Sequence, residues 1–227
     1  MAEPVFSLSD ASLSLKGNAG IVDILKGISL EVKKGETLGL VGPSGSGKSS
    51  LLMLMGGLER ATGGRVAALG QNLTTMNEDQ LARFRRDNMG IVFQSFHLIP
   101  TMTALENVIT ATDVHKKSGL VGALFGLPRA RREERENRVR ALEMLKFIGI
   151  EEYADRLAKN LPYGVQRRLE IARALGTSPR LLLLDEPAAG FNPAEKVELA
   201  ALIKRIRDAG YTVLLIEHDM SLIMGIS

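Results

Sequence analysis

A glycine-rich segment directly after a short apolar run constrains this sequence more than any other feature. Residues 42–49 read Gly-Pro-Ser-Gly-Ser-Gly-Lys-Ser; they follow the apolar run 37–41 and precede the helix-favouring residues 50–55. This spacing fits G-x-x-x-x-G-K-[ST] between a strand and a helix, the context of a phosphate-binding loop. The sequence therefore predicts a nucleotide phosphate site rather than an ordinary glycine-rich turn.

The residue types in this segment have distinct expected roles. Glycines let the backbone wrap a phosphate and point its N–H groups inward, and the following helix adds the positive end of its dipole. Lys48 supplies a charge for the β and γ phosphates, and Ser49 offers a hydroxyl to Mg²⁺. The residues predicted to bind the nucleotide here are Gly42, Pro43, Ser44, Gly45, Ser46, Gly47, Lys48, Ser49 and Ser50.

A second magnesium ligand is expected where the apolar run 181–184 ends, because α/β sheets bind ligands at the carboxyl ends of their strands. Asp185 occupies this position and Glu186 follows directly. With Asp185 in the magnesium shell, Glu186 is placed to orient or deprotonate an attacking water. We therefore predict a metal ligand followed by a general base.

The other apolar runs predict a doubly wound α/β core. Residues 28–33 alternate between apolar and polar, as in a half-buried strand, whereas 91–93, 181–184 and 212–216 are continuously apolar, as in buried parallel strands. Residues 192–210 begin with a capping Asn and a Pro, repeat apolar residues at helical spacing and end at Gly. Strands that alternate with helices favour a parallel sheet.

Composition excludes several classes of function. The 227 residues fit one domain and include no cysteine, which excludes disulfides, thiolate metal sites and cysteine nucleophiles. The net charge is only +3, so no nucleic-acid partner is expected. Opposite charges at i, i+4 spacing within residues 129–140 favour a solvated helix face over a nucleic-acid patch.

The N-terminal twenty residues contain acids and a proline where a signal peptide needs a basic start and an apolar stretch. No window approaches the 18 consecutive apolar residues of a membrane span. We expect a cytoplasmic chain that reaches the inner face of the membrane through a partner.

Several motifs in one order resemble the ATP-binding subunits of ABC transporters, and the resemblance covers nearly the whole chain. They are the phosphate loop 42–49, Gln94 after an apolar strand, Leu161-Pro-Tyr-Gly-Val-Gln166, the strand that ends in Asp185-Glu186-Pro187, and His218 after another strand. The resemblance implies a P-loop NTPase core with a mainly parallel sheet, an N-terminal antiparallel β subdomain and a helical subdomain. Residues 1–93 and 161–227 are then the nucleotide-binding core, and 94–160 the surface that docks on transmembrane permease subunits.

The same resemblance implies roles for further residues. Gln94 senses the γ-phosphate and Mg²⁺, and His218 contacts the γ-phosphate. A helix that begins near Val165 presents its amides, with Tyr163, Gly164 and Gln166, to the ATP of a second ABC ATPase subunit. Two ATP molecules are then held between two chains of a homodimer or heterodimer, and hydrolysis releases the chains.

The chain also departs from the family pattern. Pro162 and Tyr163 stand at the Ser and first Gly positions of Leu-Ser-Gly-Gly-Gln, and Asn192 stands where relatives commonly have Asp. No Phe, Tyr or Trp lies between Phe6 and the phosphate loop, so Leu15 or Val22 is expected to contact the adenine.

The two parts of the chain resemble different branches of the family. The part from Gly35 to about Val108 resembles subunits that power lipoprotein, lipid or macrolide export, and the part from about Thr110 resembles branched-chain amino-acid importers. We therefore expect a recombined chain. Since the sequence stops at Ser227, within the helix after His218, we also expect a trimmed chain.

These features favour a Mg·ATP-driven subunit for branched-chain amino-acid uptake. Lipid or lipoprotein export is the alternative, because Gln94 and its neighbours resemble the export group. Two further alternatives are a soluble ABC ATPase without a membrane partner and a chain that binds ATP without turnover.

Overall fold

The computed structural model describes residues 4–17, 20–43, 45–112, 128–218 and 220–226. They form two compact units, one made of Met1–Gln94 and Arg180–Ser227 and the other of Ser95–Pro179. Within the described ranges, no helix combines the length and the apolar character that crossing a membrane requires.

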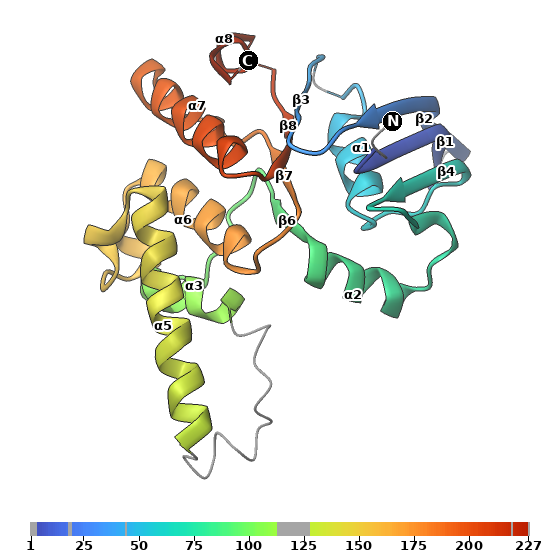
Figure 1. The fold of residues 1–227 in the computed structure, drawn as a ribbon. Helices are drawn as coiled ribbons and strands as arrows, with labels where there is room; N and C mark the ends of the chain where they lie inside the picture. The colour runs from blue at the N-terminus through green and yellow to red at the C-terminus, as the bar shows by residue number, and fades with distance from the viewer. Residues whose placement is uncertain (1–3, 18–19, 44, 113–127, 219, 227) are drawn as a thin grey trace. The chain divides into compact units, whose positions relative to one another are not determined.

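A four-stranded parallel sheet organises the first unit, in the strand order β3-β8-β7-β6. Its strands are β3 (Thr37–Leu40), β8 (Thr212–Ile216), β7 (Leu181–Asp185) and β6 (Met89–Val92). Every residue of β7 and β8 is buried, so both faces of the sheet are covered. Helix α1 (Lys48–Met55) contacts β7 and β8, and α7 (Pro193–Asp208) contacts β8 and α8 (Met220–Ile226) (Figure 1). The predicted buried parallel strands are confirmed.

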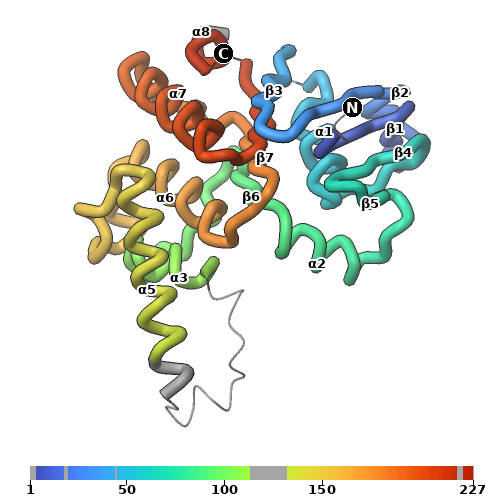
Figure 2. Tube along the Cα trace, viewed as in Figure 1, coloured from blue at the N-terminus to red at the C-terminus, as the bar shows by residue number. Residues whose placement is uncertain are grey.

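A second, antiparallel sheet in the same unit has the order β2-β1-β4-β5. Its strands are β1 (Phe6–Gly17), β2 (Gly20–Val32), β4 (Gly63–Ala68) and β5 (Gln71–Asn72). Figure 2 shows β5 beside β4, at the edge of this sheet. A 3₁₀ turn (Leu73–Thr75) and α2 (Glu78–Asn88) then lead to β6. The antiparallel β subdomain that the family resemblance implied is therefore present.

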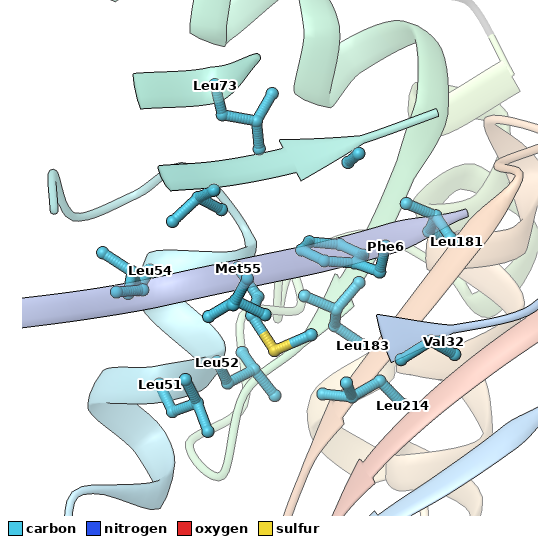
Figure 3. Close-up of a cluster of buried hydrophobic side chains, with 14 of the residues drawn as sticks. Phe6, Val32, Leu51, Leu52, Leu54, Met55, Leu73, Leu181, Leu183 and Leu214 are labelled. Carbon is cyan, nitrogen blue, oxygen red and sulfur yellow. The ribbon is translucent and has the colours of Figure 1, made fainter. Parts of the chain in front are cut away.

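The main hydrophobic core of this unit gathers side chains from both sheets and from α1. Phe6 of β1, Leu52 and Met55 of α1 and Leu183 of β7 are at most 3% exposed (Figure 3). Burial of large apolar side chains stabilises a fold by roughly 1.5–3 kcal/mol each. The apolar residues of α1 therefore anchor this helix in the core, and its first turn remains at the end that follows the glycine-rich segment.

The second unit is mainly helical. Helices α3 (Ala104–Thr112), α5 (Pro128–Ile148) and α6 (Tyr163–Gly176) contact one another, and short 3₁₀ turns at Glu151–Tyr153 and Ala158–Asn160 connect α5 to α6. On the exposed part of α5, the Nε of Arg132 lies 2.8 Å from Oε1 of Glu136, one of the ion pairs expected from the i, i+4 spacing.

The division differs from the predicted boundaries mainly at its second point. The second part of the nucleotide-binding core was predicted to begin at residue 161, whereas in the structure the first unit resumes at Arg180. The reason is that α6 packs on α3 and α5, and therefore belongs to the helical unit. This helix also begins at Tyr163, two residues before the predicted start, with Pro162 as its N-cap.

Candidate functional site

The carboxyl ends of the four parallel strands carry the predicted chemistry of the first unit. The segment 41–47 follows β3, Gln94 follows β6 by two residues, Asp185 ends β7, and His218 follows β8 by two residues. Parallel strands place such residues at one edge of a sheet, which is where α/β folds bind ligands. The edge combines a glycine-rich loop, two carboxylates, an amide and an imidazole.

Gly47 fixes the junction between the phosphate loop and α1. Its φ of 87° lies in the left-handed region, and a Cβ atom there would meet Leu25 Cδ2 at 3.1 Å and the carbonyl oxygen of Ile24 at 3.2 Å. Gly45, with a φ of 78°, also has a left-handed backbone. Only glycine adopts this conformation without strain. The loop thus brings its backbone close to β2 while it turns into the helix.

The start of α1 offers several N–H donors. Lys48, Ser49 and Ser50 form its first turn, whose N–H groups have no intrahelical acceptor, and Leu51 is the first residue to bond within the helix, to the carbonyl of Gly47. These donors and the positive end of the helix dipole suit an anion. Ser44, which was also predicted to bind phosphate, lies outside the described residues.

The ammonium group of Lys48 bridges the start of the loop. Its Nζ donates to the carbonyl oxygens of Gly42 and Pro43, both at 2.8 Å. A backbone bond from Ser46 to Pro43, 3.3 Å long, closes the turn inside this bridge. The lysine side chain thus lies across the start of the loop.

Ser49 and Asp185, two of the predicted magnesium ligands, are brought together. The Ser49 hydroxyl donates to Oδ1 of Asp185 at 3.2 Å, although the two residues are 136 positions apart in the sequence. Asp185 is only 6% exposed. Gln94, the third predicted ligand, instead donates from its side-chain amide to Oε2 of Glu186 at 3.2 Å.

Glu186 lies between Gln94 and His218 with an unusual backbone. Its φ of 45° is in the left-handed region, which costs a non-glycine residue roughly 1–2 kcal/mol. Its Oε2 atom lies 3.9 Å from Nδ1 of His218, whose side chain is 60% exposed. Strained residues persist where the surrounding contacts determine them strongly, often at functional sites. The structure therefore gathers Gln94, Glu186 and His218 into one group.

The β1–β2 hairpin carries the two aliphatic residues expected at the adenine. Leu15 and Val22 lie opposite each other in the antiparallel pair, and they are 43% and 53% exposed. Both side chains are aliphatic and partly open to solvent.

The remaining predicted binding residues belong to the helical unit. Tyr163 and Gly164 form the first turn of α6, and Tyr163 is 45% exposed. The side-chain amide of Gln166 donates to the carbonyl oxygen of Leu161 at 2.8 Å, which ties the helix start to the preceding loop. The Tyr163 ring also packs edge-on against Phe96, with 5.0 Å between ring centroids.

A buried charge pair in the helical unit was not predicted. Arg167 is fully buried, its NH1 lies 2.8 Å from Oε2 of Glu170, and its guanidinium lies 4.8 Å from the centroid of Phe96. Oε1 of Glu170 accepts the backbone N–H of His97 at 2.6 Å, and the burial of this carboxyl raises its pKa above the ordinary value. The sequence signal was a charged pair at i, i+3 within an otherwise apolar helix face.

Glu217 is the second residue that sequence reasoning missed. Its carboxylate is only 1% exposed, and Oε1 accepts the backbone N–H of Ala188 at 2.9 Å. The available signal was its position, since an acidic residue follows the apolar strand 212–216 directly, as Asp185 does at the end of 181–184.

Comparison with known proteins identifies the class to which this site belongs. A family model described as ABC transporter matches residues 25–189. The chain belongs to this family, and it is an ATP-binding subunit with ATPase activity.

Individual relatives match along nearly the whole chain. The high-affinity branched-chain amino acid transport ATP-binding protein LivG of Escherichia coli K12 is 40% identical over all of this chain and 87% of its own length. BraF of Pseudomonas aeruginosa is 38% identical with the same coverage. The macrolide export protein MacB of Shigella flexneri is 35% identical over 95% of this chain and 31% of its own length. LivG, BraF and MacB each align with this chain on both sides of Thr110. These matches therefore do not support the expectation of a recombined chain.

Solved structures agree with the fold. The ATP-binding cassette MJ0796, described as a dimer in a post-hydrolysis state bound to ADP and Pi, has a TM-score of 0.83 and 33% identity, covering 97% of this chain and 90% of that one. The ADP form of the cassette MJ1267 has a TM-score of 0.80 and 26% identity, covering 99% of this chain and 85% of that one. The predicted ABC ATPase fold is therefore confirmed.

Proposed function

We propose that the chain hydrolyses ATP at the carboxyl edge of the β3-β8-β7-β6 sheet and thereby drives the uptake of branched-chain amino acids. The observation that carries this proposal is the convergence of the phosphate loop, the Asp185-Glu186 pair, Gln94 and His218 at one edge. The substrate class is supported by the LivG and BraF relatives, which match the chain from end to end.

The phosphates of ATP bind to the loop 42–49 and to the first turn of α1. The N–H groups there point to one side, and the helix dipole favours negative charge at this end. Lys48 then exchanges its carbonyl partners, Gly42 and Pro43, for β and γ phosphate oxygens. Leu15 and Val22 contact the adenine through aliphatic groups alone.

Ser49 and Asp185 fit Mg²⁺, which prefers oxygen ligands and takes few of them from the protein. Their hydroxyl and carboxylate oxygens already lie 3.2 Å apart. Mg²⁺ commonly binds through one or two carboxylates together with substrate phosphates and water, so this small donor set suits it. When bound there, Mg²⁺ neutralises charge on the phosphates.

Glu186 acts on the attacking water as its general base or orienting group. Gln94 donates to its carboxylate and so holds it in place, and Nδ1 of His218 lies 3.9 Å from the same carboxylate. From there His218 contacts the γ-phosphate. A positioned base of this kind contributes typically 10²–10⁴-fold to a rate. The strained backbone of Glu186 is consistent with a carboxylate kept in one orientation.

A second ABC ATPase subunit completes the cycle. Tyr163, Gly164 and Gln166, at the start of α6, face the ATP bound by that second chain, so that ATP joins two chains and hydrolysis separates them. Support comes from the exposure of Tyr163 and from the dimeric relative MJ0796. Pro162 leaves the α6 start without the side-chain hydroxyl of a serine.

Transmembrane permease subunits bind to residues 94–160, and the chain works in the cytoplasm at the inner face of the membrane. Export of a lipid, lipoprotein or macrolide is the second candidate, because MacB also matches 95% of this chain. Exchange of residues 94–110 for those of an exporter tests the docking role, since permease binding that survives the exchange contradicts it.

Light scattering of the Glu186→Gln variant tests the ATPase mechanism. With Mg·ATP we expect a dimer, because this variant binds ATP but hydrolyses it at least about 100-fold more slowly than the wild type. Lys48→Ala is the matched control, and we expect it to remain monomeric with weakened ATP binding. Wild-type turnover in Glu186→Gln contradicts the role of Glu186, and ATP binding without dimer or turnover supports the alternative of a chain without motor activity.

Uptake of labelled leucine tests the substrate class. The chain is expressed in an Escherichia coli strain that lacks LivG, with the Glu186→Gln variant as the inactive control. Restored uptake by the wild-type chain alone supports a branched-chain amino-acid importer. Equal uptake with the wild-type chain and with Glu186→Gln contradicts an importer, and export of a lipid by the reconstituted complex favours the second candidate.

A further inference from the structure

The loop that carries Glu186 is attached to the end of β8 at two points. The backbone N–H of Glu186 donates to the carbonyl oxygen of Ile216 at 3.0 Å, and the N–H of Ala188 donates to Oε1 of Glu217 at 2.9 Å. A third bond, from the N–H of Ala189 to the carbonyl of Glu186 at 3.1 Å, closes the turn between them. Ile216 and Glu217, consecutive residues at the end of β8, therefore hold the loop at Glu186 itself and two residues after it.

Glu217 also connects this loop to the phosphate loop. Its own N–H donates to the carbonyl oxygen of Leu40 at 3.1 Å, at the end of β3 and two residues before Gly42. Its other carboxylate oxygen, Oε2, lies 3.9 Å from Nδ1 of His218. One buried residue thus contacts the segments that carry the phosphate loop, Glu186 and His218.

We propose that Glu217 is a positioning residue for ATP hydrolysis: its hydrogen bond to Ala188 keeps Glu186 in the orientation in which its carboxylate contacts Gln94 and His218. A carboxylate is costly to bury, and it is retained where it makes specific hydrogen bonds. The left-handed backbone of Glu186 needs such a constraint, because a residue in this region relaxes when its neighbours allow it. This inference rests on the proposed role of Glu186.

The chain offers a matched control at the other end of the same strand. Thr212 is 3% exposed, and its Oγ1 accepts the backbone N–H of Gly35 at 2.9 Å. Like Glu217, it is a buried side chain that holds the N–H of a loop, but its loop precedes β3 at the opposite edge of the sheet. Thr212→Val therefore removes the same kind of bond without contact to the site.

The test compares Glu217→Ala, Glu217→Gln and Thr212→Val by steady-state ATPase kinetics and by melting temperature. A misplaced group at a reaction site costs up to about 100-fold, so we expect Glu217→Ala to lose about 10–100-fold in kcat with little change in the KM for ATP. Glu217→Gln keeps an acceptor for Ala188, and we expect it to retain most of kcat. Thr212→Val should lower the melting temperature about as much as Glu217→Ala does, because each variant loses one buried hydrogen bond to a backbone N–H. Its kcat should stay within about twofold of the wild type.

Amide hydrogen exchange gives a readout that does not depend on turnover. Glu217→Ala should accelerate exchange in a peptide that spans residues 186–191, whereas Glu217→Gln and Thr212→Val should not. Unchanged exchange in Glu217→Ala overturns the proposal, as does a kcat loss in Glu217→Gln equal to that in Glu217→Ala. Equal kcat losses in Thr212→Val and Glu217→Ala also overturn it, because the effect is then one of stability.

The variant Glu186→Gln separates this inference from the proposed function. If Glu186→Gln is inactive and Glu217→Ala has wild-type kcat, the positioning role of Glu217 is wrong and the proposed mechanism stands. If Glu186→Gln turns over normally, the role assigned to Glu186 is wrong, whatever Glu217→Ala does.

Discussion

Replacement of Gly47 by alanine should damage both the fold and the nucleotide site. The backbone of Gly47 has a φ of 87°, and an alanine in the left-handed region costs roughly 1–2 kcal/mol. The added Cβ would also lie 3.1 Å from Leu25 Cδ2 and 3.2 Å from the carbonyl oxygen of Ile24. Leu25 can move its methyl group, but Ile24 contributes a backbone atom of β2, so the loop itself has to shift.

Overpacking of this kind costs about 1–3 kcal/mol, which brings the expected loss of unfolding free energy to about 2–5 kcal/mol. In a domain of this size about 1 kcal/mol lowers Tm by about 2–4 °C, so the expected fall is roughly 4–20 °C. The shift moves the first-turn N–H groups of α1 away from the phosphate position, and we expect ATP to bind at least about tenfold more weakly.

Gly70→Ala is the matched control. Gly70 has a φ of 76°, and no described atom outside its own chain neighbours lies within 4 Å of the Cβ position. This variant therefore carries the left-handed cost alone, with nucleotide affinity unchanged. Differential scanning fluorimetry and titration with a fluorescent ATP analogue measure both quantities. The reasoning is refuted if the two variants melt together and bind the analogue equally well.

Three further predictions concern other parts of the chain. Asn192 caps α7 through a reciprocal capping box with Glu195, so Asn192→Ala should cost about 1 kcal/mol in urea unfolding and Asn192→Asp almost nothing; an equal cost in both would contradict the cap. Burial raises the pKa of Glu170, so the contribution of this residue to stability should fall as pH rises from about 4.5 through its folded pKa. Glu170→Gln should therefore flatten this part of a plot of urea midpoint against pH, and an unaltered plot would contradict the raised pKa. Leu15→Tyr should strengthen ATP binding about fivefold or more by stacking on the base, and a titration that shows no gain would move the adenine elsewhere.

The parallel sheet and most of its edge could be predicted because their signals are local. Each buried strand is a continuous apolar run, and the phosphate loop, Asp185 and Glu186 directly follow such runs. Asn192 and Pro193, adjacent in the sequence, likewise marked the start of α7, where they are the N-cap and the first helical residue. In these segments the residues that determine the structure are neighbours in the sequence.

The first strand could not be predicted, because its alternation changes phase. Phe6 and Leu8 are buried on even positions, Ala11 and Leu13 on odd ones, and the register with β2 shifts between Leu8 and Ala11. Asp10, in this interval, has a φ of 49°. A bulge inserts a residue and reverses which side chains face inward, so a strict period of two fails there.

The contact between Glu217 and Ala188, within the first unit, was hidden for a different reason. The two residues are 29 positions apart in the sequence, and only the pairing of β7 with β8 brings them together. The boundary at Arg180 is likewise set by the packing of α6 on α3 and α5. Pattern and spacing fix what a segment is, but they do not fix which distant segment it contacts.

The two carbonyl oxygens that hold Lys48 have a consequence for which anions the proposed phosphate loop would bind. Any anion that recruits this ammonium has to replace hydrogen bonds of 2.8 Å to Gly42 and Pro43. A small, singly charged anion recovers little beyond what it displaces, whereas a polyphosphate chain also reaches the N–H groups at the start of α1. On the proposed function, small cellular anions should therefore compete poorly with a nucleoside triphosphate for this loop.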